Sequence, residues 1–227
     1  MRTKIYNLII LDESGSMNSI WEQTVSGCNE MIDSVKVLQE KFGDKQEHFI
    51  SIYSFQSGTE YSRYIIKDMP VEKAAHITIE DYIPNGLTPL YDAVGVTLSD
   101  LFVTMKGEDF AIASVTIITD GMENSSKEYS HEMVSQMIKK CKEKGWNFNF
   151  IGANIDEKKV ASSLNIDNSM SFVQNDDGVK LMFLKDRESR MRFFRKVNRN
   201  INSGMTVDEF YAKMTEVSKG YFDEDKS

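Results

Sequence analysis

The sequence predicts an α/β protein with a doubly wound, mostly parallel sheet that is covered by helices on both faces. Three observations support this prediction: short runs rich in branched and aromatic residues, longer segments with helical periodicity, and the regular alternation of the two. Strands that alternate with helices form parallel sheets with a helix layer on each face, so three layers are expected.

Four short apolar segments predict buried strands, because a parallel strand covered on both faces is apolar along its whole length. They are residues 5–11, 49–55, 115–119 and 146–152. The stretch "YSRYII" (residues 61–66) predicts an edge strand, with a connection after Pro70. A last short strand is predicted at residues 170–173.

Longer segments with apolar residues at helical spacing predict the helices between these strands. They cover residues 20–42, 89–105, 130–144 and 157–164, and two further helices are predicted in the C-terminal segment. Pro89 suits the first turn of its helix, because the N–H that proline lacks has no partner there. Gly145 follows the third helix as a stop signal.

Length, composition and charge predict one globular domain and disfavour several classes of partner. The chain has 227 residues, 41% of them hydrophobic, which is enough for a sizeable core. Its net charge of -8 predicts repulsion from nucleic acid and from anionic membranes. No apolar segment approaches the length that crosses a bilayer. The two cysteines, Cys28 and Cys141, lie in predicted helices, and this fits reduced thiols in a cytoplasmic protein.

Two acids directly follow predicted strands: Asp12 in "IILDESGS" and Asp120 in "TIITDGMEN". The carboxyl ends of parallel strands meet at one edge of a doubly wound sheet, where ligands bind. The two carboxylates are therefore expected to lie close together, and a shared cation would neutralise both. Ser14 and Ser16 alternate with Asp12, and Gly15 permits a tight turn, so this loop can direct three oxygens to one point. Such ligands suit a hard cation such as Mg²⁺.

Thr88 in "NGLTPLYDAV" completes a recognisable pattern: D-x-S-x-S after the first strand, a threonine before a mid-chain helix, and an aspartate after a later strand. This pattern resembles the von Willebrand factor type A (vWA) domain family, with its metal-ion-dependent adhesion site (MIDAS). The matching residues are Asp12, Ser14, Ser16, Thr88 and Asp120. The resemblance covers roughly the first three quarters of the chain.

The resemblance implies a three-layer, Rossmann-like domain in residues 1–178 that holds Mg²⁺ or Mn²⁺, with Ca²⁺ as a further candidate. It also implies that the two serines and the threonine bind the metal, while the aspartates act partly through water. In this family a carboxylate of a partner protein often completes the coordination. The implied partner is therefore a protein that presents Asp or Glu, and the implied chemistry is binding.

Three alternatives remain open beside metal-dependent binding. The serines and Thr88 could merely cap the helices that begin near Ile20 and at Pro89. The domain could be a structural scaffold with a relic metal site. It could also be a metal-dependent phosphoesterase or hydrolase, although Ser14 stands where a D-x-D phosphatase has its second acid. No G-x-S-x-G or G-x-G-x-x-G motif is present, and no enzyme is expected.

The other polar residues that could take part in chemistry are interpreted as ordinary surface groups. Glu13 and Glu123 are predicted to be solvated loop residues. His48, His76 and His131 are predicted to be surface or cap residues, because they are scattered over strand, loop and helix. None of them is therefore assigned a catalytic role.

A polar break at residues 175–178 predicts a boundary before a helical segment at 179–227, which is expected to pack on the same domain. Residues 180–199 are strongly basic: they hold Lys180, Lys185, Arg187, Arg190, Arg192, Arg195, Lys196 and Arg199 against only Asp186 and Glu188. Apolar residues at near-helical spacing predict a buried face that leaves the basic side in solvent. They are Leu181, Met182, Leu184, Met191, Phe194 and Val197. A partner docked on the basic side would be acidic.

These expectations together describe a cytoplasmic, bacterial adaptor of the vWA type. Its bound metal would recognise a carboxylate of a separately encoded protein. The identity of that protein does not follow from the residues.

Overall fold

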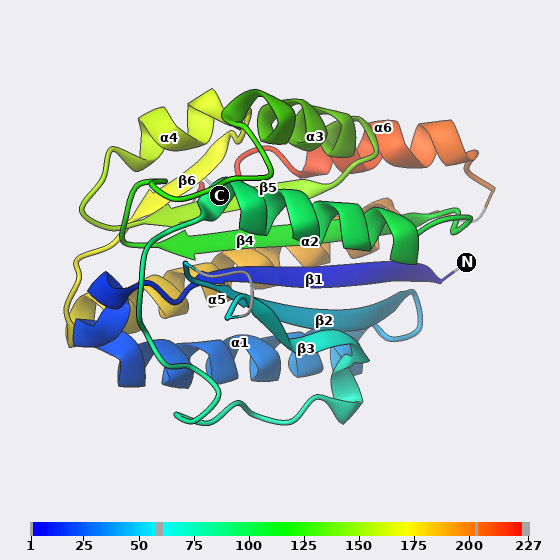
Figure 1. Ribbon diagram of the computed structural model, residues 1–227. Helices are drawn as coiled ribbons and strands as arrows, with labels where there is room; N and C mark the ends of the chain where they lie inside the picture. The colour runs from blue at the N-terminus through cyan, green and yellow to red at the C-terminus, as the bar shows by residue number, and fades with distance from the viewer. Residues whose placement is uncertain (1, 58–60, 203, 224–227) are drawn as a thin grey trace.

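Six strands form one sheet in the order β3-β2-β1-β4-β5-β6 in the part of the chain that the computed structural model describes, residues 2–57, 61–202 and 204–223 (Figure 1). The strands are β1 (Thr3–Asp12), β2 (Gln46–Phe55), β3 (Arg63–Pro70), β4 (Ala111–Thr119), β5 (Asn147–Gly152) and β6 (Asn168–Ser171). The edge strand β3 runs antiparallel to β2, and every other pair is parallel. The predicted α/β class with a mostly parallel sheet is confirmed.

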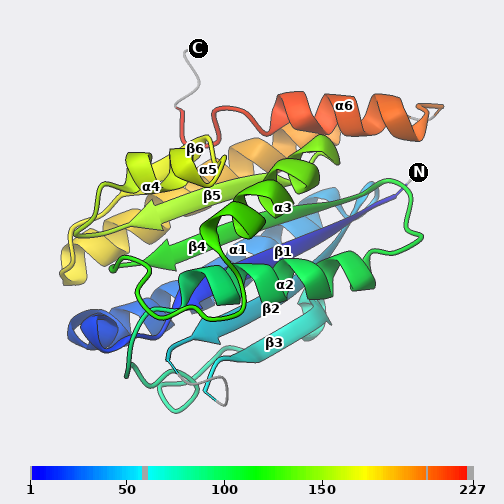
Figure 2. The same ribbon diagram turned by 45° about the horizontal axis from the view of Figure 1, so that its top comes forward.

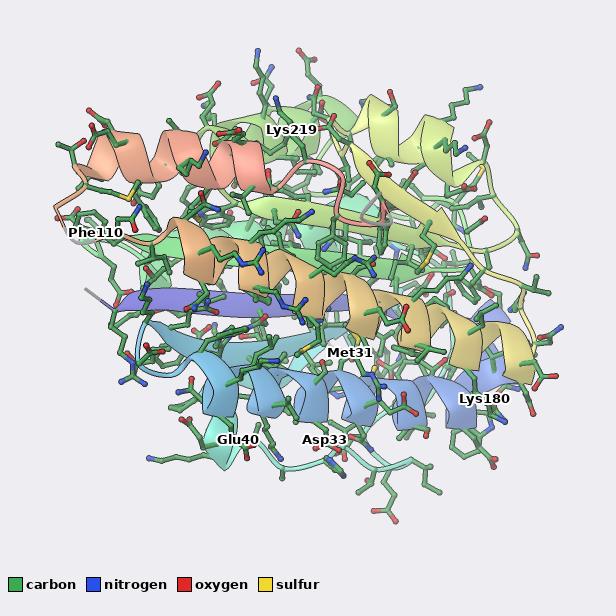
Figure 3. The ribbon with its side chains drawn as sticks, turned by 180° about the vertical axis from the view of Figure 1, so that it is seen from behind. Met31, Asp33, Glu40, Phe110, Lys180 and Lys219 are labelled. Carbon is green, nitrogen blue, oxygen red and sulfur yellow. The ribbon has the colours of Figure 1, made fainter. Side chains whose placement is uncertain are left out.

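Helices cover both faces of the sheet (Figures 1 and 2). One face carries α2 (Leu90–Thr104), α3 (His131–Glu143) and α4 (Glu157–Ser163). The opposite face carries α1 (Trp21–Phe42) and α5 (Asp176–Asn200), which lie side by side in Figure 3. The last helix, α6 (Val207–Val217), contacts both α5 and α3. Two short 3-10 helices, η1 (Gly15–Ile20) and η2 (Val71–Lys73), complete the described elements.

The central strands are buried on both faces, and this explains why they are apolar along their whole length. In β1, Leu8 and Ile10 pack toward α2, while Ile9 and Leu11 pack toward α1. On the α1 side, Gly27 lets α5 approach closely, since a methyl group there would lie 1.9 Å from the Phe183 ring. The sheet is thus held between two apolar layers.

The predicted boundaries near the last strand are wrong by a few residues. Strand β6 ends at Ser171, whereas residues 170–173 were expected. The polar residues 175–178 are the cap and first turn of α5, because the Asn175 side chain accepts a hydrogen bond of 2.8 Å from the Gly178 N–H. A cut after residue 178 would fall within that turn. The division into 1–178 and 179–227 stays a prediction, and residues 224–227 lie outside the described ranges.

Helix α5 buries only part of the predicted apolar face, since Met182, Phe194 and Val197 are buried as predicted. Leu181 and Leu184 are 51% and 41% exposed, and Phe183 and Phe193 take the buried places. Arg190, expected among the solvated cations, is 1% exposed. It forms an internal ion pair with Asp186, the acid one turn before it, and the two nearest atoms are 2.9 Å apart. No helix of the described chain is both long and apolar enough to span a membrane.

Candidate metal centre

The predicted site residues gather at the carboxyl edge of the sheet, where β1 and β4 end next to each other (Figure 1). Asp12 is the last residue of β1, and Asp120 directly follows β4. Because β1 and β4 pair in register up to Leu11 and Ile118, the two acids leave the sheet side by side. The topology therefore brings together carboxylates that are far apart in sequence.

Asp12 is fully buried and held by neighbours at both of its carboxylate oxygens. Oδ1 accepts a hydrogen bond of 2.8 Å from the Ser14 N–H, and Oδ2 accepts one of 2.6 Å from the Thr119 hydroxyl. The Tyr82 hydroxyl donates to the backbone oxygen of Asp12 at 2.6 Å. The carboxylate therefore has one fixed orientation at the end of the strand.

The two serine hydroxyls link Asp12 to Asp120. Ser14 and Ser16 have their Oγ atoms 3.1 Å apart, and the Ser16 hydroxyl donates to Asp120 Oδ1 at 2.7 Å. Ser14 is 2% exposed, whereas Ser16 is an exposed residue. The site therefore opens to solvent at Ser16, and an ion or a partner group could enter from that side.

The Thr88 side chain points into the same space. Its backbone is held by Asn124, with the Thr88 N–H donating to Asn124 Oδ1 at 2.9 Å and the Asn124 N–H donating to the Thr88 carbonyl at 3.2 Å. Thr88 is 3% exposed, yet its hydroxyl makes no hydrogen bond with any described residue. The hydroxyl is thus not engaged by another described protein group, and it adjoins the other oxygens of the site.

Gly121 shows how closely these oxygens converge. A Cβ atom at this glycine would lie 3.3 Å from Thr88 Oγ1 and 4.0 Å from both Asp12 Oδ2 and Ser16 Oγ. The space beside Gly121 is therefore a small cradle lined by oxygens from the segment after β1 and from the loop before α2. Two carboxylates and three hydroxyls are a donor set that suits a hard divalent cation.

Burial makes the carboxylates of the site costly without a cation. It raises the pKa of Asp12 to about 6, against an ordinary value of 3.8, and the negative charge of Asp120 adds to the rise. The pKa of Asp120 is raised as well, chiefly by burial, while hydrogen bonds from Ser16 and Gln174 act against this rise. A bound cation would offset the cost of two buried negative charges.

The capping alternative does not account for the hydroxyls. Ser14 stands at the N-cap position of η1 but makes no side-chain cap hydrogen bond. Helix α2 has Pro89, not Thr88, at its N-cap position, and α1 follows directly on η1 with Ile20 there. The Ser16 and Thr88 hydroxyls thus line the cradle, and Ser14 Oγ lies 3.1 Å from Ser16 Oγ instead of capping a helix.

Sequence reasoning missed Gln174, which lies between β6 and α5. Its side-chain amide donates to Asp120 Oδ2 and to the Ser16 carbonyl, and its oxygen accepts from Asn154. Gln174 follows the last strand by three residues and so belongs to the same edge of the sheet as Asp12. This position after the last strand was the only sequence signal that could have pointed to Gln174, because a single glutamine matches no motif.

Glu13 was predicted to be a solvated loop residue, and this is wrong. Its side chain is fully buried and pairs with Arg63 of β3, with Oε2 and Nη1 2.9 Å apart. Glu13 Oε1 also accepts the N–H of Ile83 at 2.5 Å. Glu13 therefore ties the loop before α2 to the end of β1, next to the cradle.

Of the three histidines and Glu123, which were expected at the surface, two are exposed and two are not. His76 and His131 are exposed, as predicted, whereas His48 is fully buried. Glu123 is half-buried rather than solvated, and it accepts N–H groups of Ser125, Ser126 and Tyr91 at 2.7 to 2.9 Å. Glu123 therefore stabilises the start of α2, and its oxygens are occupied by backbone donors.

No cluster of three or more His, Cys, Asp or Glu side chains that could hold a metal exists among the described residues. The cradle contains two acids, and its remaining oxygens come from hydroxyls. Such a site differs from a Cys/His zinc centre and from a carboxylate-rich calcium loop. The donor set fits a cation that keeps part of its coordination sphere open.

Comparisons with known proteins support the fold but do not show the family. No family model matches the chain, and no curated protein is significantly similar to it. Similar solved structures include the open pilus adhesin SpaC of Lactobacillus rhamnosus GG, with 12% identity, a TM-score of 0.62 and coverage of 85% of this chain and 30% of that one. The manganese-loaded TRAP protein of Plasmodium vivax has 18% identity, a TM-score of 0.50 and coverage of 80% and 72%.

A third similar structure is proximal thread matrix protein 1 of the mussel byssus with a zinc-occupied MIDAS motif. It has 13% identity and a TM-score of 0.52, and the match covers 81% of this chain and 44% of that one. The chain thus spans less than half of the mussel protein and of the pilus adhesin. At these identities the likeness shows the fold, and the chain has a vWA-like, Rossmann-type architecture.

Proposed function

We propose that the chain belongs to the vWA family and is a divalent-cation-dependent protein-binding module of the adaptor type. Asp12, Ser14, Ser16, Thr88 and Asp120 would hold the cation in the cradle beside Gly121. The observation that carries the proposal is the convergence of Thr88 Oγ1, Asp12 Oδ2 and Ser16 Oγ on that one small space. The cation would recognise an Asp or Glu side chain of a partner protein.

The donor set explains why such a cation would bind a partner. Neutral hydroxyls leave more of the positive charge uncompensated than a ring of carboxylates does, and the ion therefore attracts a further acid. Mg²⁺ and Mn²⁺ fit a mixed set of oxygen ligands and water, and Ca²⁺ is a further candidate. Two of the similar structures are a manganese-loaded protein and a protein with a zinc-occupied MIDAS motif, which supports a divalent ion in general.

The buried thiols support the proposed cytoplasmic location. Cys28 and Cys141 are both free and buried, on opposite faces of the sheet. They are thus separated by the sheet and do not form a disulfide. Buried free thiols fit a reducing compartment better than an oxidising one.

The basic face of α5 is narrower than predicted, and it remains a proposed second contact for an acidic partner. Arg190 is buried and therefore does not contribute to the basic face. The exposed cations are Lys180, Lys185, Arg187, Arg195 and Arg199, and none of them makes an ion pair with a described residue. Lys180 marks one end of this face in Figure 3.

Calorimetric titration with Mg²⁺ and Mn²⁺ tests the metal site. We expect saturable heat with the unchanged protein and no heat with Asp12→Ala, because that change removes a carboxylate from the cradle. Ser16→Ala removes an exposed hydroxyl, and about a tenfold weaker affinity is expected without loss of folding. Asn18→Ala is the matched control, since Asn18 is exposed in the same 3-10 helix and lies outside the cradle.

The same proteins separate a binding module from the phosphoesterase alternative. A panel of generic phosphoesters, assayed with Mg²⁺ and with Mn²⁺, should show no turnover above that of metal alone. Turnover that requires metal and disappears in Asp12→Ala would overturn the proposal. Absence of heat with the unchanged protein would instead favour a scaffold with a relic site.

A further inference from the structure

Four large apolar side chains lie exposed around the candidate metal centre. Ile83 is 62% exposed, Leu87 52%, Met122 65% and Val173 66%. We call these four residues the apolar rim. Single exposed apolar residues are common on protein surfaces, but their gathering around one site points to a binding surface.

Three residues of the apolar rim are direct sequence neighbours of residues at the site. Leu87 precedes Thr88, and Val173 precedes Gln174. Met122 follows Gly121, the residue that lines the cradle. Adjacent Cα atoms are about 3.8 Å apart, so the backbone of these three residues lies directly beside residues of the site.

The backbone of Ile83 is held near the site by Glu13, the residue after Asp12, because Glu13 Oε1 accepts the Ile83 N–H at 2.5 Å. The rim therefore comes from three separate segments: the loop before α2, the loop after β4, and the loop after β6. All of these loops lie at the carboxyl edge of the sheet (Figure 1). A ligand centred on the cradle would meet apolar side chains from more than one direction.

Hydrogen bonds fix the backbone in the loop before α2 and in the loop after β6. The Leu87 N–H donates to Ser57 Oγ at 2.9 Å, and the Leu87 carbonyl accepts the Ser57 N–H at 3.0 Å. The Val173 carbonyl accepts the Asn175 N–H at 2.8 Å. The rim is thus a preformed surface, and its residues would lose little backbone freedom on binding.

The geometry points to an acidic peptide segment as the partner: we propose that the module binds an Asp or Glu that is flanked on both sides by large apolar side chains. The carboxylate would approach the cation at the exposed Ser16, and the flanking side chains would cover the apolar rim. The buried apolar area would contribute most of the affinity, while the contact between the carboxylate and the cation would fix the position of the peptide. This inference rests on the proposed function, because the cation is needed to hold the acid.

A set of fluorescein-labelled nine-residue peptides tests the inference. The central residue is Glu, with Leu and Phe on both sides in one series and Ser on both sides in another. In Mg²⁺ the apolar series should bind at least about tenfold more tightly by fluorescence anisotropy. Replacing the central Glu by Gln, or adding EDTA, should abolish binding of both series.

The double variant Met122→Ser, Val173→Ser should reduce this preference to about threefold or less while leaving the Mg²⁺ affinity unchanged by calorimetry. Met133→Ser is the matched control, since Met133 is 48% exposed on α3 and lies outside the rim. Equal binding of the two series, no binding of either, or an unchanged preference in the double variant would overturn the inference. If the unchanged protein binds no metal, the proposed function fails first, and the inference fails with it.

Discussion

Asp120 has a hydrogen-bond donor at each of its carboxylate oxygens. Ser16 donates to Oδ1, and the Gln174 amide donates to Oδ2. The Ser16 hydroxyl lies beside the cradle, and Gln174 holds the other oxygen of the carboxylate. Gln174 is therefore a positioning residue: it would act on the cation through the orientation of Asp120, in the way that partners of metal ligands commonly do.

Gln174→Ala is expected to weaken Mg²⁺ binding about tenfold, because Asp120 loses the donor that orients it. Asn154→Ala removes the donor to the Gln174 oxygen, and a smaller loss is expected. The unfolding temperature without metal should change little in both variants, since the Gln174 side chain is partly exposed. Affinities equal to that of the unchanged protein, measured by calorimetry, would contradict this role.

The residues of the centre were predictable to the extent that they belong to a pattern along the chain. Asp12 and Asp120 end apolar strands, and this position alone places them at one edge of the sheet. Glu13 was misjudged, because its burial depends on Arg63, fifty residues later in an edge strand. Contacts of this kind depend on the packing of loops, which no local pattern encodes.

At the scale of elements, α5 packs on the sheet through polar as well as apolar contacts. Arg190 donates to Asp186 and to the Thr116 hydroxyl of β4, and the Tyr221 hydroxyl donates to Asp186. His48 of β2 lies under the same helix and makes a T-shaped ring contact with Phe194. The periodicity of α5 predicted this face in part: Met182, Phe194 and Val197 are buried, but apolar spacing did not indicate the buried ion pair of Arg190 and Asp186.

His48 is held in its neutral form. Its Nε2 lies 3.0 Å from Gln46 Oε1 and its Nδ1 lies 3.3 Å from Asn7 Nδ2. These partners fit a neutral ring that donates at Nε2 and accepts at Nδ1. Burial, followed by the positive charges of Arg190 and Arg2, lowers the pKa of His48 to about 3, from an ordinary value of 6.5.

This lowered pKa predicts a loss of stability in acid. Between about pH 3 and 6.5 the unfolded chain binds a proton at His48 that the folded chain does not, so the free energy of unfolding falls as the pH falls. The contribution is complete above pH 6.5 and declines by roughly 1.4 kcal/mol per pH unit below it. Urea unfolding from pH 7 to 5 should show a shallower decline in His48→Gln, and identical slopes would contradict the assignment.

At the scale of the whole molecule, the doubly wound topology creates the candidate site. Neighbouring parallel strands β1 and β4 deliver Asp12 and Asp120 to one edge, and the loop before α2 brings Thr88 over them. The alternation of apolar strands with amphipathic helices was enough to predict this architecture. The exact ends of elements, such as the strand expected at residues 170–173, could not be predicted from this alternation, because they depend on local hydrogen bonds and caps.

Anomalous diffraction from crystals grown in saturating Mn²⁺ tests the central claim most directly, because it locates the ion. The account predicts one strong peak in the cradle beside Gly121, coordinated by the hydroxyls of Ser14, Ser16 and Thr88, and no such peak in Asp12→Ala crystals. An empty cradle in crystals of the unchanged protein, or a manganese ion bound only elsewhere, would contradict it.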